Sequence, residues 1–263
     1  MNIIEAMRER RSVRTFDGNG LSPEQVSQLE QIIDESNSPF GGSVSIKLKK
    51  FDKKEGYKPS TYGMIKGAED FFLLAIGNDE ASALSAGYRF EQVVLKSWQL
   101  GLGTCWIAAT FKGSDFDKGM TWPEGEELKV ICPVGASEKI SIKEKLTRLA
   151  LGSKNRKPFN DLFFYNNFST VVPEDNQFRE ALEMLRLAPS DTNSQPWRAL
   201  VDGNNVHFYY KPKSPAAVLD LGIGICHFNE TEKFNGRNGD FVKVENTPTP
   251  PDNWKYLISY MLK

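Results

Sequence analysis

Apolar residues spaced three and four apart predict a helix near the start of the chain. Residues 22–35 carry helix start signals, because Ser22 suits a cap, Pro23 suits the first turn and Gln25 completes a capping box. Four apolar residues then share one face, which indicates a helix packed on a core. They are Val26, Leu29, Ile32 and Ile33.

Other stretches extend this pattern. The segment 87–101 predicts a buried helix, and residues 3–7 predict a short amphipathic one. Short apolar runs between polar turns predict strands. The strands are expected at 44–51, 71–76, 104–110 and 128–135, and later at 205–211, 240–246 and 254–262. Helices and strands mixed in this way predict an α+β fold with mixed sheets and packed helices.

The pattern then restarts. A helix opened by Pro173 is expected from about residue 171, with Phe178, Ala181, Leu182 and Leu185 as its apolar face. Two proline pairs and two glycine pairs also keep equal spacings in the same order. The spacing is sixteen residues for Pro23 to Pro39 and Pro173 to Pro189, and fourteen for Gly87 to Gly101 and Gly222 to Gly236.

These spacings predict an internal duplication that forms a pseudo-dimer within one chain. The first unit is expected over residues 1–165 and a second, shorter unit over residues 166–263, joined by the connection 163–174. The alternative is a single α+β domain whose helices happen to share lengths.

Composition limits the possible functions. The chain has 263 residues, of which 40% are hydrophobic and 25% charged, as in ordinary soluble globular proteins. A formal net charge of −1 gives no field that favours nucleic acid or an anionic membrane, so neither is expected as a partner. The apolar runs are too short to span a bilayer.

The cysteines and histidines narrow the picture further. No CxxC pair and no secretion signal are found, so we expect reduced, buried thiols and a cytoplasmic protein. The cysteines are Cys105, Cys132 and Cys226. With only His207 and His227 available, a histidine-rich metal site is excluded and no metal is expected.

Two basic clusters could bind an anion. In "RRSVR", Arg10 and Arg14 are four residues apart and would share a face at a helix end, where they could grip a phosphate. In "SKNRKP", Lys154 and Arg156 alternate and would point the same way from an extended segment. Each cluster alone is equally consistent with a solvated basic turn.

Two further stretches suit a planar polar ligand. "PSDTNSQPW" at 189–197 offers Ser190, Asn193 and Gln195, whose hydroxyl and amides can both donate and accept hydrogen bonds. "GLGTCWIAA" at 101–109 is a tight, small-residue entry into an expected strand, which lets a ligand approach the backbone. The simpler interpretation of the first stretch is a polar loop.

Together these four segments resemble the FMN-dependent nitroreductase family, over most of the chain. The late loop resembles the branch in which two nitroreductase-like units are fused in one polypeptide. In that family, FMN binds between two units: one gives the arginine motif and the strand after the glycines, and the other gives the "PSxxNxQPW" loop. The resemblance therefore implies a nitroreductase-like α+β fold.

The resemblance also assigns roles to residues. The first unit would hold the phosphate, ribityl chain and flavin edge, the second unit would contact the ring and ribityl hydroxyls, and Lys66 is a looser match. Asp191 departs from the small residue common at its position. The residues are Arg10, Ser12, Arg14, Lys154 and Arg156 for the first group, Pro189, Ser190, Asp191 and Asn193 for the second, and Trp106, Ile107 and Ala108 along the ring.

The two units differ in what they keep. At the loop position of the first unit the sequence reads "SPFGGSVS", without the asparagine, glutamine and tryptophan, and the second unit lacks the arginine motif. One complete site and one FMN per chain are therefore expected. The flavin-loaded form is expected to include a monomer, and the alternative is a symmetric dimer of the chain. The resemblance implies ping-pong hydride transfer from NADPH or NADH through FMN to a small electron acceptor such as a nitroaromatic or quinone. No catalytic side chain is needed. The alternative is a flavin-binding or flavin-sensing protein without turnover, or a relic scaffold.

Overall fold

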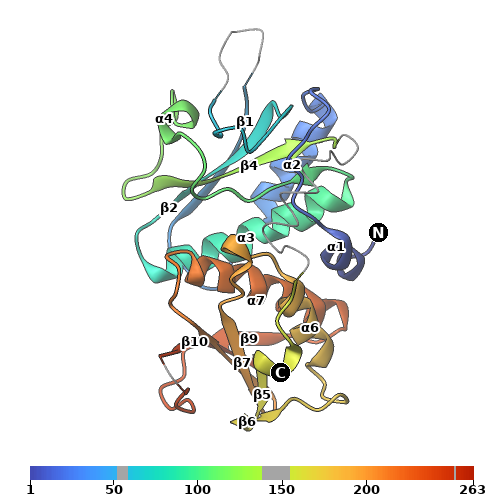
Figure 1. Ribbon diagram of the computed structural model, residues 1–263, viewed down its shortest axis with the longest axis vertical. Helices are drawn as coiled ribbons and strands as arrows, with labels where there is room; N and C mark the ends of the chain where they lie inside the picture. Colours follow the sequence, from blue (N-terminus) through green and yellow to red (C-terminus); the bar gives the residue numbers. More distant parts are fainter. Residues whose placement is uncertain (52–58, 138–154, 252) are drawn as a thin grey trace.

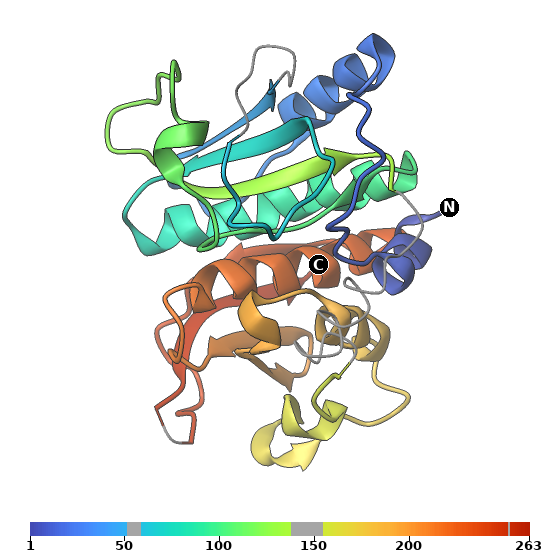
Figure 2. The same ribbon diagram turned by 45° about the horizontal axis from the view of Figure 1, so that its top comes forward.

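The computed structural model describes residues 1–51, 59–137, 155–251 and 253–263, and shows two antiparallel-rich sheets with a pair of long helices between them (Figures 1 and 2). The four strands of the first sheet lie in the order β1-β2-β4-β3. The strands are β1 (Val44–Lys50), β2 (Asp70–Ile76), β4 (Glu127–Gly135) and β3 (Gly103–Thr104).

The first sheet is covered on both faces, and its strand β2 is therefore buried along its whole length. Phe72 and Leu74 face helices α2 (Pro23–Glu35) and α3 (Glu80–Gln99), which share one core cluster with them. Phe71 and Leu73 face the other way. They pack with Phe116 of the short helix α4 (Gly113–Phe116) and with the segment that follows the N-terminal helix.

The second sheet has six strands in the order β6-β5-β7-β8-β10-β9. Only the β5–β7 pair is parallel in the described chain. Helices α6 (Arg179–Leu187) and α7 (Ala217–Phe234) share its main core cluster. The strands are β5 (Phe163–Tyr165), β6 (Asn167–Val171), β7 (Trp197–Asp202), β8 (Asn205–Tyr210), β9 (Gly239–Val242) and β10 (Lys255–Leu262).

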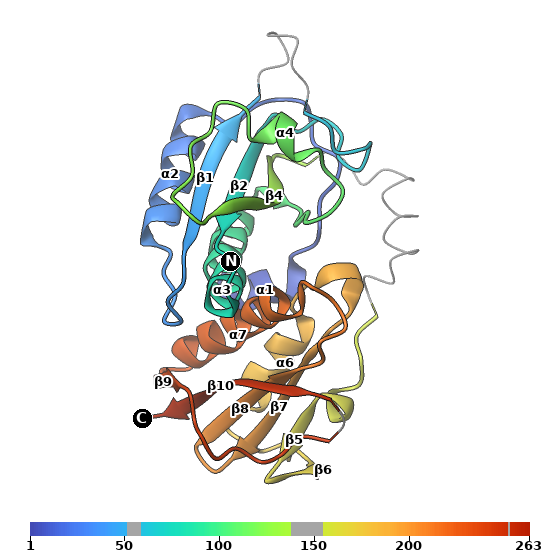
Figure 3. The same cartoon turned by 90° about the vertical axis from the view of Figure 1, so that its left-hand side faces the viewer.

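Helices α3 and α7 pack along each other at the centre of the molecule, between the two sheets (Figure 2). The N-terminal helix α1 (Ile3–Glu9) lies beside α7 and α6 (Figure 3). Its apolar residues Ile4, Ala6 and Met7 belong to the core cluster of the second sheet, far from α1 in sequence. The chain therefore crosses from one core to the other immediately after residue 9.

Four strands of the second sheet repeat the strand order of the first. Apart from the short helix α4, the first set of elements is α2, β1, β2, α3, β3, β4, and after β5 and β6 the order α6, β7, β8, α7, β9, β10 follows. In space the strands run β1-β2-β4-β3 in one sheet and β7-β8-β10-β9 in the other, with antiparallel neighbours throughout both sets. The expected boundary between residues 165 and 166 falls inside the second sheet, between β5 and β6.

The expected α+β class is confirmed, and the capping box of α2 is present in full, with Ser22 accepting from the Gln25 amide at 3.2 Å.

Several expected elements differ from those in the structure. The helix placed at Pro173 begins at Arg179, because the Asn176 side chain accepts from the Phe178 amide and holds residues 173–178 in turns. The strand expected at 104–110 is paired only at Gly103–Thr104 and at a single Ile107 bridge.

The connection expected over 163–174 instead supplies strands β5 and β6. Strand β7 was not expected from the pattern. No described helix combines the length and the apolar character that a membrane crossing requires.

Candidate functional site

The polar loop that follows α6 has a strained backbone. Thr192, Asn193 and Gln195 take φ values of 47°, 56° and 49°, in the left-handed region that non-glycine residues rarely adopt. Each such residue costs on the order of 1–3 kcal/mol unless its surroundings hold it there, and such strain concentrates at binding sites. The loop is therefore held by other parts of the chain.

Gln195 fastens the loop to the segment 155–157. Its side chain is buried, accepts from the Lys157 amide at 2.8 Å and donates to the Asn155 carbonyl at 3.2 Å. The backbone N–H of Gln195 in turn donates to the Ser190 hydroxyl at 3.0 Å. The side-chain amide of Asn193 donates to the same Asn155 carbonyl at 2.8 Å. The loop and the second basic cluster thus form one unit.

A buried carboxylate holds the other side of the loop. Asp220, near the start of α7, accepts from the Asp191 amide at 3.0 and 3.1 Å. The Ser194 hydroxyl donates to it at 3.4 Å. Burial raises the pKa of Asp220 to about 7, although the hydrogen bond from Asp191 acts in the opposite direction. Asp191 itself is exposed, and its own carboxylate accepts from Ser214.

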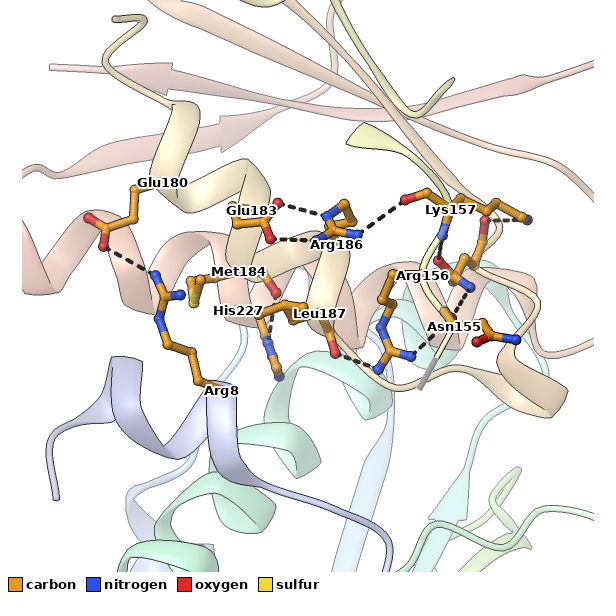
Figure 4. Close-up of polar contacts among 11 residues, drawn as sticks. Arg8, Asn155, Arg156, Lys157, Glu180, Glu183, Met184, Arg186, Leu187 and His227 are labelled. Carbon is orange, nitrogen blue, oxygen red and sulfur yellow. Dashed lines mark hydrogen bonds and ion pairs between the residues drawn. The ribbon is translucent and has the colours of Figure 1, made fainter. Parts of the chain in front are cut away.

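Arg156 joins this loop to the end of α6. Its guanidinium donates to the Leu187 carbonyl at 2.9 Å (Figure 4). It also donates to the Asn193 side-chain oxygen at 3.1 Å. Burial, and next the positive charge of Arg10, lower the pKa of Arg156 to about 10. The charges of Arg10 and Arg156, far apart in the sequence, therefore influence each other.

The arginine motif runs from the end of α1 along the edge of the first sheet. Arg10 ends α1, Ser12 bridges Thr104, and the Arg14 carbonyl accepts from the Lys66 amide at 2.9 Å. Within the described ranges, three guanidinium nitrogens of this motif are buried without a hydrogen-bond partner. They are Arg10 Nη1, Arg11 Nε and Arg14 Nη1.

The segment after the glycines is split between core and surface. Trp106 is half-buried and meets the Phe90 ring edge-on at 4.7 Å. Ile107 is buried, and both its amide and its carbonyl pair with Ile131. Ala108 is exposed. Ile107 is thus a core residue of the first sheet, whereas Trp106 and Ala108 lie nearer its rim.

A fully buried carboxylate lies beneath these groups. Glu91 of α3 accepts from the Trp106 indole at 2.9 Å, lies 2.9 Å from His227 Nε2, and forms an ion pair with Arg10 Nε at 3.8 Å. His227 Nδ1 lies 3.0 Å from the Met184 carbonyl of α6 (Figure 4). The sequence motifs named neither Glu91 nor His227. The sequence sign that could have revealed Glu91 is a charged residue among the buried apolar residues of α3.

The structure thus connects several of the expected site residues. One hydrogen-bonded unit contains Arg156, Asn193 and Ser190, and Arg10 and Trp106 meet at Glu91. Arg14 and Ser12 pair through the backbone with Lys66 and Thr104 instead. Pro189 follows the end of α6 directly, and Lys154 lies outside the described residues.

The donor set fits an anionic, hydrogen-bonding ligand better than a metal ion. It consists of guanidinium groups, amides and hydroxyls, which bind phosphate and polar ring edges. In the described ranges, no three His, Cys, Asp or Glu side chains are grouped so that they could hold a metal. The three cysteines are free and buried, as expected, and His207 contacts Ser259 at 2.7 Å.

Comparison with known proteins gives the following matches. A "putative nitroreductase" from Thermotoga maritima MSB8 is 20% identical, covers 100% of this chain and 93% of its own, and has a TM-score of 0.63, so the fold is shared. Nitroreductases with bound FMN from Bacteroides fragilis and Desulfitobacterium hafniense are 13% and 15% identical. Each covers 54% of this chain and 91% or 92% of its own, with TM-scores of 0.44 and 0.45.

No curated protein sequence matches the chain. The family model described as "Putative TM nitroreductase" matches residues 2–231, most of the sequence. The chain therefore belongs to this nitroreductase family.

Proposed function

We propose that the protein is an FMN-dependent oxidoreductase with one FMN bound between the N-terminal arginine motif and the loop after α6. The observation that carries this proposal is the group of buried guanidinium nitrogens in the arginine motif that have no hydrogen-bond partner among the described residues: Arg10 Nη1, Arg11 Nε and Arg14 Nη1. Cationic donors of this kind favour an anionic ligand such as the FMN phosphate.

The residues around this point fit the rest of FMN. Arg10 Nη1 and Arg14 Nη1 are buried donors that have no partner in the described part of the chain. Ser190 and Asn193 offer a hydroxyl and an amide for the ribityl chain and ring edge. Trp106 would border the ring, with Ala108 at the exposed rim. The proposed FMN-binding residues also include Ser12, Lys154 and Pro189. Ile107 would support the site from the core of the first sheet.

We further propose that the chain is a pseudo-dimer of two nitroreductase-like units, with one complete site. The shared strand order of the two sheets and the central α3–α7 pair support this proposal. The segment 38–45, which follows α2, would take the place in the first unit that the loop after α6 takes in the second. It lacks the asparagine and glutamine, so a second FMN has no matching site, and a monomer suffices.

Bound FMN would supply the two-electron hydride chemistry that no side chain of the protein provides. The chain's own residues would hold the cofactor, orient it and limit water around it. The proposed electron donor is NADPH or NADH, and the proposed acceptor is a nitroaromatic, quinone or similar electron-poor molecule. Both would use the same open face in turn.

Colour tests the proposal directly. The full chain, saturated with FMN and gel-filtered, should stay yellow, bleach anaerobically with NADPH or NADH, and regain colour when a quinone or nitroaromatic is added. A protein that stays yellow but never bleaches would be a flavin-binding protein without turnover. A protein that remains colourless after exposure to FMN would contradict the proposal. Arg8→Ala changes an exposed arginine of α1, the helix that Arg10 ends, and should behave as the wild type does in this test.

A further inference from the structure

We propose that Glu91 is a positioning residue for the proposed flavin site, and that it fixes Arg10 and Trp106 through one carboxylate that His227 holds in place. This inference rests on the proposed function and extends it to two residues outside every sequence motif. Glu91 and His227 would not touch the cofactor. They would determine how two residues that do touch it are oriented.

The carboxylate of Glu91 has three partners and no exposure. One oxygen accepts from Trp106 Nε1 at 2.9 Å. The other lies 2.9 Å from His227 Nε2 and 3.8 Å from Arg10 Nε. Both oxygens are therefore engaged, and the rotation of Glu91 is fixed by partners that arrive from three directions.

The ring of His227 is fixed in the same way. Its Nδ1 faces the Met184 carbonyl at 3.0 Å, and because a carbonyl only accepts, that nitrogen carries a hydrogen. Its Nε2 lies 2.9 Å from Glu91 Oε1, and this contact needs a second hydrogen, which the imidazole and the carboxyl group share between these two atoms. His227 thus spans α6 and α3, and its side chain is 1% exposed.

The binding of Arg10 by Nε leaves its outer nitrogens for another partner. Arg10 Nη1 is buried and has no hydrogen-bond partner among the residues that the structure describes. A guanidinium held on one edge presents its other edge in a fixed direction, which lowers the cost of binding an anion there. The Glu91 contact therefore orients the group that the ligand would use.

The same helix end fixes the second arginine. In the last turn of α6, the Met184 carbonyl faces His227 and the Leu187 carbonyl accepts from Arg156 at 2.9 Å (Figure 4). A continuous set of contacts thus runs from Arg10 through Glu91, His227 and α6 to Arg156. A buried ion cluster is no more stabilising than apolar packing of similar volume, so this cluster calls for a role other than stability.

The test uses the full chain and FMN itself. Glu91→Gln keeps the size of the side chain but removes its charge and one acceptor oxygen. Tyr88→Phe is the matched control, because Tyr88 also lies buried in α3 and its hydroxyl accepts a hydrogen bond from Asn229 of α7. The measurements are the FMN dissociation constant, the reduction potential of bound FMN and the melting temperature.

We expect Glu91→Gln to weaken FMN binding by about tenfold or more. It should also change the potential of bound FMN, because the Arg10 cation at the proposed site is no longer held in one orientation. Tyr88→Phe should change the dissociation constant less than about twofold and leave the potential in place. In an Arg10→Ala background, Glu91→Gln should weaken binding much less than in the wild type, since it acts through Arg10.

Unchanged or tighter FMN binding by a folded Glu91→Gln variant would overturn the inference while leaving the proposed function intact. So would an equal loss of binding in Tyr88→Phe. If Glu91→Gln does not fold, His227→Leu replaces it, with a severalfold weaker FMN affinity expected by the same argument, and unchanged affinity counts against it. A wild-type protein that binds no FMN would reject the proposed function itself, and this inference with it.

Discussion

Gly87 of α3 and Gly222 of α7 make the same contact in opposite directions. A Cβ atom on Gly87 would collide with the Leu219 carbonyl, and a Cβ on Gly222 would collide with the Leu84 carbonyl. Each of these leucines lies three residues before the glycine of its own helix. Such reciprocity is the mark of a twofold interface. It is found here between two helices of one chain.

Because the collisions are with backbone, neither glycine can be enlarged without moving a helix. Gly87→Ala and Gly222→Ala should each lower the free energy of unfolding by about 3 kcal/mol or more, at the upper end of the cost of overpacking. Gly113→Ala is the control, since its Cβ would meet only a ring carbon at 4.0 Å. Thermal or urea denaturation measures the effect, and a large loss at one glycine with none at the other would contradict the reciprocal packing.

Arg10→Ala should weaken FMN binding without unfolding the protein. Loss of one charge-assisted contact corresponds to about 1.5–3 kcal/mol, or roughly ten- to a hundredfold in affinity. Flavin fluorescence titration gives the dissociation constant. Arg8→Ala, in the same helix but paired with Glu180 at 4.0 Å on the surface, should bind FMN as the wild type does. Equal affinities for the two variants would remove Arg10 from the site.

The number of flavins per chain tests the proposed asymmetry. Titration of the full chain should end at one FMN per polypeptide, because the segment 38–45 has no counterparts of Asn193 and Gln195. Sedimentation of the flavin-loaded protein should include a monomer. A titration that ends at two flavins per chain would refute the single-site proposal.

The pKa of Asp220 predicts a pH effect on stability. Its folded-state pKa of about 7 lies above the ordinary 3.8, so between these values the folded protein holds a proton that the unfolded chain releases. Stability is then lost as pH rises, by about 2 kcal/mol between pH 5 and pH 7. Melting curves of Asp220→Asn should lack this loss, whereas the exposed Asp34→Asn should keep it. Identical slopes for both variants and wild type would show that Asp220 is ionised throughout.

Patterns within short stretches of sequence predicted most helices and strands. They failed where contacts with distant parts of the chain determine the secondary structure. The capping box of Ser22 and Gln25 is a contact within one turn, so the sequence shows it directly. Strand β6 lies at a sheet edge with mostly exposed residues, and so has no apolar alternation to find. Strand β7 contains the buried Arg198, a charge that conceals a buried strand.

The site divides in the same way. Arg156 and Asn193 belong to short sequence motifs around a strained loop, so they can be recognised in the sequence. The residues that hold the motif side chains in place belong to no motif and cannot be recognised in this way. Glu91 and His227 are 136 positions apart, and Asp220 lies in an ordinary apolar helix start. Only the packing of α3 on α7 brings such groups together.

The position of α1 has a consequence for folding. Helix α1 contacts α3, but its apolar residues Ile4 and Met7 also belong to the core cluster around α6 and α7, and α6 begins only at Arg179. The apolar face of α1 is therefore covered in full only when helices from the distant second half of the chain are in place. Such long-range contacts slow folding, and until they form they leave apolar surface open to other chains.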